Sequence, residues 1–234
     1  MKTRTKQESK AKIKRGITEL IIPHENTVVT FAYPSFGTNT YRDVGKQILE
    51  NNLQIPTSEQ IASLLHASYC SELKDEPEFQ NIRKIMSDRW LWVFNRNLWT
   101  DKGVYVIPDL EAKGLSETLN ENELEALLKN GKEINGVRFS KDKKVRFAPK
   151  DSYKDELAEN GFVVASYGKE GAEQLAEIST KFLSGFRVYG LNLQKGDTSQ
   201  LRCSALGGYG GYGLEVVGDD FDDYRRGCSF GVFK

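Results

Sequence analysis

The stretch from Leu201 to Phe233 restricts the possible folds of this chain more than any other part of its sequence. Lys, Glu and Gln are frequent elsewhere in the chain, but between Cys203 and Phe233 only Glu215 belongs to these three types. Gly, Tyr, Asp, Ser and Arg replace them. Tyr offers a large contact area at low entropic cost, and Gly and Ser offer small adaptable contacts. Apolar residues interrupt this composition at Leu206, Leu214, Val216, Val217, Phe221, Phe230, Val232 and Phe233. The stretch therefore predicts a binding surface built on short strands rather than a Gly-rich linker.

The charge balance removes some classes of partner. Lys+Arg 33 against Asp+Glu 33 gives a formal net charge of +0, so we expect no overall attraction to nucleic acid or to an anionic membrane. No apolar run approaches the roughly 20 residues that span a bilayer, and the charged N-terminus lacks the apolar segment of a secretory signal. The default expectation is a cytoplasmic monomer that binds neither nucleic acid nor membrane.

The length of 234 residues is enough for one sizeable domain. We expect a disordered basic arm over 1–15 and a single α+β domain over 16–234, with helices early and short strands late. Apolar spacing predicts helices at 41–52, from 57 onward, and at 76–88, 120–129 and 171–183. It predicts strands at 17–23, 27–33, 89–100, 102–108, 162–167 and 186–193, and a hairpin over 136–148.

Two of these elements carry the most specific patterns. Thr57 and Gln60 have the spacing of a capping box, which marks the start of a helix. That helix would bury Ile61, Leu64 and Leu65. The segment 89–100 holds all three tryptophans, and its apolar residues fall on both faces, as is typical of a central strand covered on each side. An aromatic shelf for a cofactor or a glycan is the alternative interpretation of this segment.

No group of residues has a catalytic or metal-binding spacing. His24 and His66 lie in no ligand motif, so a zinc site would have to be assembled from distant residues. No Ser/His/Asp or Cys/His set can be assigned, and we expect neither catalytic residues nor a cofactor nor a metal. Asp219–Asp223 could offer oxygen ligands to calcium but lacks the EF-hand spacing. A solvated loop anchored by Phe221 is the preferred interpretation of this acidic run.

The cysteines Cys70, Cys203 and Cys228 form no CxxC pattern. A bridge between Cys203 and Cys228 is conceivable if the two lie on adjacent strands. Free thiols in a reducing compartment are the preferred interpretation.

Two motifs resemble a known family. The segment 53–60, Leu-Gln-Ile-Pro-Thr-Ser-Glu-Gln, is similar to a helix start in C-type-lectin-like domains of the formylglycine-generating-enzyme type. The segment 224–233, Tyr-Arg-Arg-Gly-Cys-Ser-Phe-Gly-Val-Phe, resembles the closing strand of such domains. Within that superfamily, the terminal stretch resembles the variable region of target proteins of diversity-generating retroelements, and the middle of the chain is similar to proteins of small uncultivated archaea. The charged segment 110–154 has no counterpart in the minimal fold and would be an insert.

The resemblance implies a ligand-binding protein with a variable surface over 203–233. Such systems mutate template adenines, and the resulting codons exclude Lys, Glu, Gln, Met and Trp, in keeping with the composition of the stretch. Buried anchors would be Leu214, Val216, Phe221, Phe230 and Val232. The positions presented to the ligand would be Leu206, Tyr209, Tyr212, Val217, Asp219, Asp220, Asp222, Asp223 and Tyr224.

The presented tyrosines and carboxylates would suit a protein ligand with an apolar patch and a basic rim, and a glycan is the alternative. Two rival functions remain beside this binding protein. An oxidase of the formylglycine-generating type would use a close cysteine pair, which folding would have to create from Cys203 and Cys228. A structural protein of a mobile element would instead pack the terminal stretch against another subunit. The resemblance favours the binding protein over an enzyme.

Overall fold

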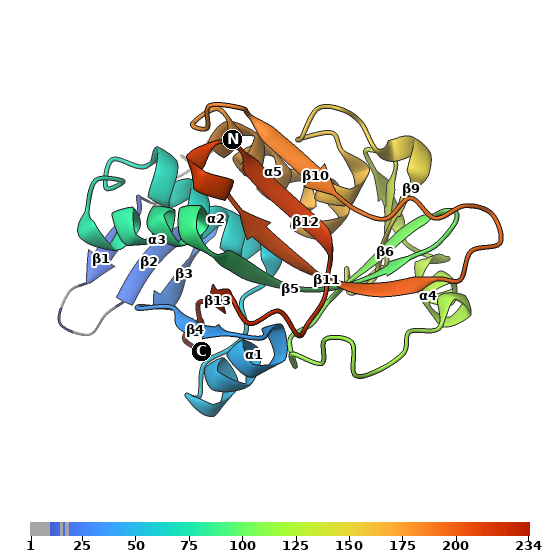
Figure 1. Ribbon diagram of the computed structural model, residues 1–234, viewed down its shortest axis with the longest axis horizontal. Helices are drawn as coiled ribbons and strands as arrows, with labels where there is room; N and C mark the ends of the chain where they lie inside the picture. The colour runs from blue at the N-terminus through green and yellow to red at the C-terminus, as the bar shows by residue number, and fades with distance from the viewer. Residues whose placement is uncertain (1–9, 15, 17–18) are drawn as a thin grey trace, which may run out of the picture.

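The computed structural model describes residues 10–14, 16 and 19–234 (Figure 1). Within these residues the main sheet has the strand order β10-β12-β11-β5-β6-β9-β8-β7, and β13 pairs with both β4 and β5. A smaller antiparallel sheet has the order β1-β2-β3. The two sheets approach each other where Phe31 forms a bridge with Val232. The expected α+β class is confirmed.

Most elements lie within a few residues of their predicted positions. The helices are α1 (Tyr41–Glu50), α2 (Ser58–Cys70), α3 (Pro77–Asp88), α4 (Glu121–Leu128) and α5 (Gly161–Ser179), with short 3-10 turns η1 (Lys150–Ser152) and η2 (Tyr209–Gly211). The first strands are β1 (Lys12–Lys14), β2 (Glu19–His24), β3 (Thr27–Ala32), β4 (Phe36–Asn39), β5 (Trp90–Trp99), β6 (Gly103–Pro108) and β7 (Lys132–Ile134). The remaining strands are β8 (Val137–Phe139), β9 (Arg146–Pro149), β10 (Phe186–Tyr189), β11 (Gln200–Gly207), β12 (Leu214–Asp220) and β13 (Gly227–Ser229).

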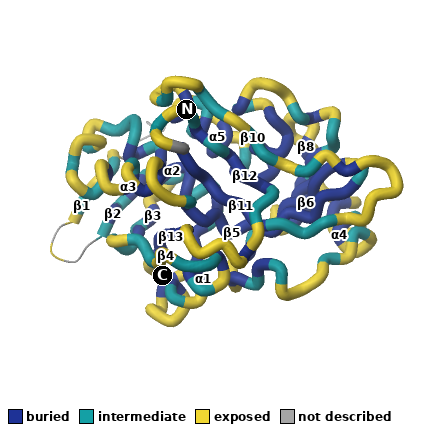
Figure 2. The backbone as a smooth tube through the Cα atoms, viewed as in Figure 1, coloured by how far each residue is buried: buried dark blue, intermediate teal, exposed yellow. Residues whose placement is uncertain are grey.

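β5 lies in the middle of the main sheet and is covered on both faces. Its Leu91 and Val93 belong to a large core with α2, α3 and α5, whereas Trp92 and Phe94 belong to a second core with α1. Successive residues of a strand point to opposite faces, so this division confirms the predicted central strand. Figure 2 shows β5, β11 and β6 as the buried centre of the molecule. Trp92 and Trp99 are buried, whereas Trp90 at the start of the strand is half-buried, so the three tryptophans do not form one exposed aromatic shelf.

The capping box at the start of α2 is confirmed. The hydroxyl of Thr57 accepts a hydrogen bond from the backbone N of Gln60 at 3.3 Å, and the Gln60 side chain accepts one from the Thr57 N at 2.9 Å. These two bonds satisfy backbone donors that the first turn of a helix leaves free. The helix so placed packs on α5. As predicted, it buries Ile61, Leu64 and Leu65 completely.

The strand predicted at 162–167 is wrong, because these residues form the first part of α5. The side-chain oxygen of Asn160 accepts hydrogen bonds from the backbone N of Phe162 (3.1 Å) and of Val163 (3.3 Å), and so caps the helix. A short apolar run does not distinguish a buried strand from a buried helix. The helix kinks at Gly168, where φ is 67°, and its second part corresponds to the helix predicted at 171–183.

The charged segment 110–154, expected as an insert, is built into the main sheet. It supplies α4 and β7 to β9, and β9 pairs with β6. Arg146 of β9 is buried and forms an ion pair with Glu59 of α2, which ties this segment to the helical layer. The basic arm expected over 1–15 lies largely outside the described residues. Within its described part, Lys12–Lys14 forms β1 and pairs with β2, which corrects the expectation of disorder there.

We predict that Thr57→Ala lowers the free energy of unfolding by about 1 kcal/mol, because the first turn of α2 loses one half of its capping box. Thr198→Ala, at an exposed loop position, is the control and should stay within about 0.5 kcal/mol of the parent. Urea denaturation followed by circular dichroism measures both. Equal effects of the two substitutions would show that the cap contributes nothing.

Candidate ligand-binding surface

The terminal stretch lies at the centre of the fold. β11 pairs with one edge of β5, β12 pairs with β11, and β13 pairs with the first residues of the other edge of β5. Four of the five expected anchors are buried, namely Leu214, Val216, Phe230 and Val232. The stretch therefore forms short strands, as predicted, and these strands help to build both cores.

The fifth expected anchor, Phe221, is not buried. Its side chain is 51% exposed, and the guanidinium of Arg202 lies 4.3 Å from the centre of its ring. The neighbouring Asp222, expected to face a ligand, is the buried residue instead. Its carboxylate oxygen Oδ2 lies 2.9 Å from Nε of Arg42 and accepts a hydrogen bond from the backbone N of Leu115 at 3.0 Å. Asp222 thus anchors the loop after β12 to α1 and to the 109–116 loop, and the two expected roles are exchanged.

The other positions expected to face a ligand divide into three groups. Leu206 and Val217 are buried, contrary to expectation, because β11 and β12 are covered on both faces. Tyr212 (62%), Tyr224 (40%) and Asp223 are exposed as expected. Asp219 and Asp220 are half-buried, and the side chain of Tyr209 lies outside the described residues.

Several glycines of the stretch are required by aromatic packing. A Cβ added at Gly227 would lie 2.0 Å from Nε1 of Trp92, a fully buried side chain whose Nε1 donates a hydrogen bond to the Asn39 carbonyl at 3.1 Å. A Cβ at Gly218 would lie 2.2 Å from Cζ of Phe162. Both distances are too short for any side chain. These glycines therefore serve close packing rather than the adaptable binding contacts that the composition suggested.

Some exposed residues of the stretch, including Tyr212 and Tyr224, meet in a groove of about 580 Å³ at one end of the main sheet. The groove lies between the end of α3, the start of β5, the turn around η2 and the residues just before β13. Its aromatic lining consists of Trp90, Tyr212 and Tyr224, and its charged lining consists of Asp88, Arg89, Glu215 and Arg226. Asp219, Asp220 and Asp223 do not line it, so the groove brings the two exposed tyrosines together without these three carboxylates.

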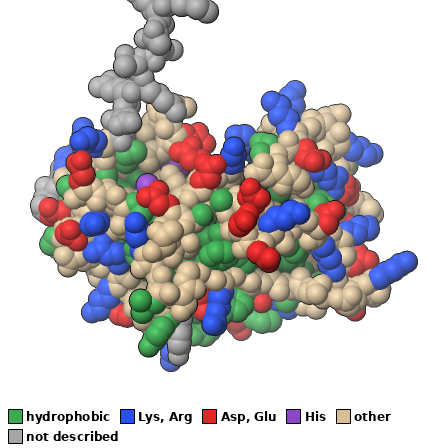
Figure 3. All heavy atoms as spheres, turned by 90° about the horizontal axis from the view of Figure 1, so that it is seen from above, with side chains coloured by type: hydrophobic (Ala, Val, Ile, Leu, Met, Phe, Trp, Pro, Cys, Tyr) green, Lys and Arg blue, Asp and Glu red, His purple; other side chains and the backbone are tan. Residues whose placement is uncertain are grey.

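The electrostatics of the groove differ from the acidic surface that the sequence suggested. Its lining carries two acidic and two basic side chains, and Glu215 accepts a hydrogen bond from the Tyr189 hydroxyl at 3.3 Å. Burial raises the pKa of Asp219 and that of Asp220 above the ordinary range of a carboxyl. Side chains of both signs are also interspersed on the face that Figure 3 displays. The candidate surface is therefore aromatic with mixed charge.

The three cysteines are free. Cys203 of β11 lies opposite Arg96 of β5, whereas Cys228 of β13 lies opposite Leu91 on the other edge of that strand. Burial raises the pKa of the Cys228 thiol to about 11 and that of Cys203 well above its ordinary value. The two thiols are thus neither bridged nor arranged as the close pair that a formylglycine-generating oxidase would use.

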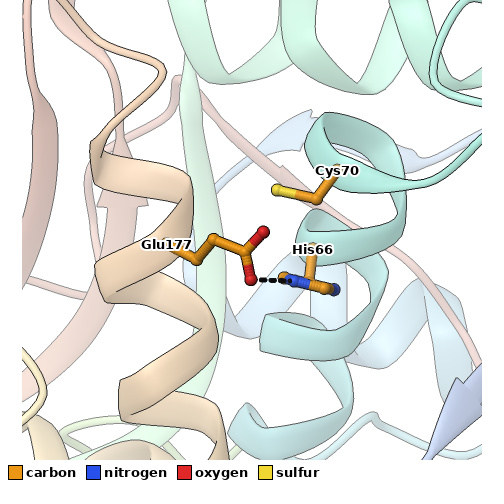
Figure 4. A group of neighbouring side chains, drawn as sticks. All are labelled: His66, Cys70 and Glu177. Carbon is orange, nitrogen blue, oxygen red and sulfur yellow. Dashed lines mark hydrogen bonds and ion pairs between the residues drawn. The ribbon is translucent and has the colours of Figure 1, made fainter.

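One cluster of functional side chains has no counterpart in the sequence-based expectations. His66 and Cys70 project from α2 toward Glu177 of α5, and His66 Nε2 lies 2.9 Å from a Glu177 oxygen (Figure 4). The hydrogen bond from His66 holds the pKa of Glu177 below its usual range, and burial raises the pKa of the Cys70 thiol to about 11. The spacing of His66 and Cys70, one helical turn apart, was visible in the sequence. The approach of Glu177 was not, because it depends on how α5 packs on α2.

Comparisons with known proteins give a distant structural similarity. No protein-family profile and no curated protein matches the chain. Among solved structures, the chain is similar to one from work on the accommodation of massive sequence variation in Nanoarchaeota by the C-type lectin fold. The TM-score is 0.47 with 14% sequence identity, and the similarity covers 85% of this chain and 96% of that chain.

We predict that Gly227→Ala lowers the free energy of unfolding by about 3 kcal/mol, at the upper end of the usual cost of overpacking, because the added Cβ collides with the fully buried ring of Trp92. Gly213→Ala is the matched control within the same stretch. Its added Cβ would lie 3.6 Å from the Gly185 oxygen, an ordinary contact, so its stability should be unchanged or raised by up to about 1 kcal/mol. Thermal and chemical denaturation compare the two. Similar losses for both would contradict the packing role of Gly227.

A second prediction contrasts a buried with an exposed side chain of the stretch. Phe230→Ala should lower the free energy of unfolding by about 3–5 kcal/mol, because the removed ring leaves a cavity in the core. Tyr212→Ser and Asp223→Asn should each stay within about 0.5 kcal/mol, as surface changes usually do. A denaturation series measures all three. If the exposed positions proved as costly as Phe230, the stretch would be structural throughout.

Proposed function

We propose that this chain is a ligand-binding protein that captures a protein ligand in the groove lined by Trp90, Tyr212 and Tyr224. The observation that carries the proposal is the meeting of these three aromatic side chains with two arginines at one end of the central sheet. Aromatic residues and Arg are the types that dominate the binding energy of protein interfaces. A glycan that stacks on the same rings is the alternative ligand.

The frame beneath the groove supports this proposal because part of its lining belongs to the strands of the main sheet. Trp90 belongs to β5, and its ring contacts Gly207, where an added Cβ would lie 2.7 Å from Cζ3. Arg89 donates a hydrogen bond to the Thr38 hydroxyl. A site held by strands in this way loses little entropy on binding.

The groove also indicates what kind of surface its ligand presents. The aromatic residues favour an apolar patch, while Asp88, Glu215, Arg89 and Arg226 place charges of both signs in the same lining. A complementary ligand therefore carries charges of both signs at the rim of its apolar patch, instead of the purely basic rim expected from the sequence.

We further propose that the surface is diversified by a retroelement, in keeping with the resemblance of the stretch over 203–233 to variable regions of such target proteins. The structure restricts where variation is tolerable. Gly218 and Gly227 contact rings in the core, and Asp222 pairs with Arg42, so these positions have to stay constant. Tyr212, Tyr224 and their exposed neighbours are free to change.

The neighbouring DNA tests the diversification. We expect a near-copy of the codons for residues 203–233 beside a reverse-transcriptase gene, with adenines concentrated at the codons of exposed positions. The absence of such a copy would remove the diversification and leave the binding proposal intact.

Two display libraries test the binding proposal. The first randomises the groove positions Tyr212, Glu215, Tyr224 and Arg226. The second randomises Glu133, Lys141, Lys144 and Lys195, which are exposed and do not line the groove. Both libraries should retain folded members, and the groove library should yield binders to a panel of purified proteins at least about tenfold more often, because its positions share one aromatic concavity. Equal yields from the two libraries would contradict the proposed site.

A further inference from the structure

The side chains of His66, Cys70 and Glu177 converge from two helices that pack on each other. His66 and Cys70 lie one turn apart on the same face of α2, and Glu177 reaches them from α5 (Figure 4). One ligand atom from each residue, an imidazole nitrogen, the Cys70 Sγ and a carboxylate oxygen, lies within 4.8 Å of the other two. Within the described part of the chain, no other group of three or more His, Cys, Asp or Glu side chains has its ligand atoms this close together.

The geometry is close to that of a tetrahedral metal. Zinc holds nitrogen and oxygen ligands at about 2.0–2.2 Å and sulfur at about 2.3 Å, which places ligand atoms roughly 3.5 Å apart. His66 Nε2 and a Glu177 oxygen are already 2.9 Å apart, and the three ligand atoms, the Cys70 sulfur included, lie within 4.8 Å of one another. The hydrogen bond between His66 and Glu177 holds two of the ligands next to each other before any cation binds.

The donor set selects the kind of cation. Imidazole, thiolate and carboxylate together suit zinc and similar transition metals, whereas calcium and magnesium take oxygen ligands almost entirely. A set of three protein ligands is also the pattern of zinc sites that keep a fourth position for water or a small ligand.

The surroundings leave that fourth position accessible. A pocket of about 470 Å³ is lined by His66 and Cys70, and also by His24, Ser63 and Glu170. Glu177 does not line this pocket, so an ion entering from it would reach the cluster on the side of His66 and Cys70. Lys74 and Lys181 lie close enough to lower the pKa of Cys70, and their positive charges oppose cation binding. The cluster is therefore expected to bind zinc more weakly than a closed four-ligand site does.

We propose that His66, Cys70 and Glu177 form a binding site for Zn²⁺, with a fourth coordination position that opens into the pocket beside α2. The site is independent of the groove at the end of the main sheet. The site links α2 to α5 across the helical layer. It is assembled from residues that lie far apart in the sequence, as the sequence analysis required of any zinc site in this chain.

The full-length chain, purified under reducing conditions, tests the site with Zn²⁺ and Co²⁺ as probes. Isothermal titration should show one Zn²⁺ per chain, and Co²⁺ should give the sulfur-to-cobalt charge-transfer band in the near ultraviolet. Cys70→Ser should abolish that band. His66→Asn and Glu177→Gln should each weaken Zn²⁺ binding at least about tenfold, because the loss of a direct ligand exceeds the effect of an outer partner.

The same pocket supplies matched controls. His24→Asn and Glu170→Gln remove one histidine and one carboxylate that line the pocket outside the cluster, and both should leave Zn²⁺ affinity within about twofold. Circular dichroism confirms that each variant is folded, and Glu177→Gln, at a side chain 55% exposed, is the variant least able to disturb the fold. If the control variants lost as much Zn²⁺ affinity as the cluster variants, the bound Zn²⁺ would be an adventitious ion only. Absence of Zn²⁺ binding, or displacement of Zn²⁺ by millimolar Mg²⁺, would overturn the proposal.

Discussion

The burial of β5 on both of its faces is the constraint on which the rest of this structure depends. A strand with Leu91 and Val93 on one side and Trp92 and Phe94 on the other needs two separate apolar covers, and the chain provides them as α2, α3 and α5 on one face and α1 on the other. Both edges of β5 must also be paired, because an unpaired backbone amide in such a position costs as much as a lost hydrogen bond. β11, β6 and β13 supply these pairs.

That constraint explains which features could be predicted from the sequence. The capping box of Thr57 and the two-faced apolar pattern of β5 are local, so both were visible without any knowledge of the fold. The first part of α5 was misread as a strand because a fully buried helix shows no polar face. Leu206 and Val217 were expected at the surface because nothing in the sequence of the terminal stretch shows that β11 and β12 are covered on both faces.

The remaining errors concern partners that lie far away in the sequence. Phe221 and Asp222 exchanged roles because the position of each depends on an arginine, Arg202 for the ring and Arg42 for the carboxylate. Local composition makes Phe the natural anchor and Asp the natural surface residue. In the same way, His66 and Cys70 could be seen as a pair, but Glu177 joins them only through the packing of α5 on α2. Sequence patterns therefore predict the elements of this fold, but they do not predict the position of a side chain that is set by a distant partner.

The pairing of β5 has a consequence for how the chain acquires its structure during synthesis. β6 follows β5 almost at once, but β11 and β13 come from residues 200–207 and 227–229. A ribosome that has completed β5 and α3 has therefore produced a tryptophan-rich strand with one edge bare, and it must add the whole of 110–199 before that edge is covered. Nascent segments of this kind are prone to aggregate. The late position of β11 therefore prolongs the time for which this edge of β5 is open to pairing with another chain.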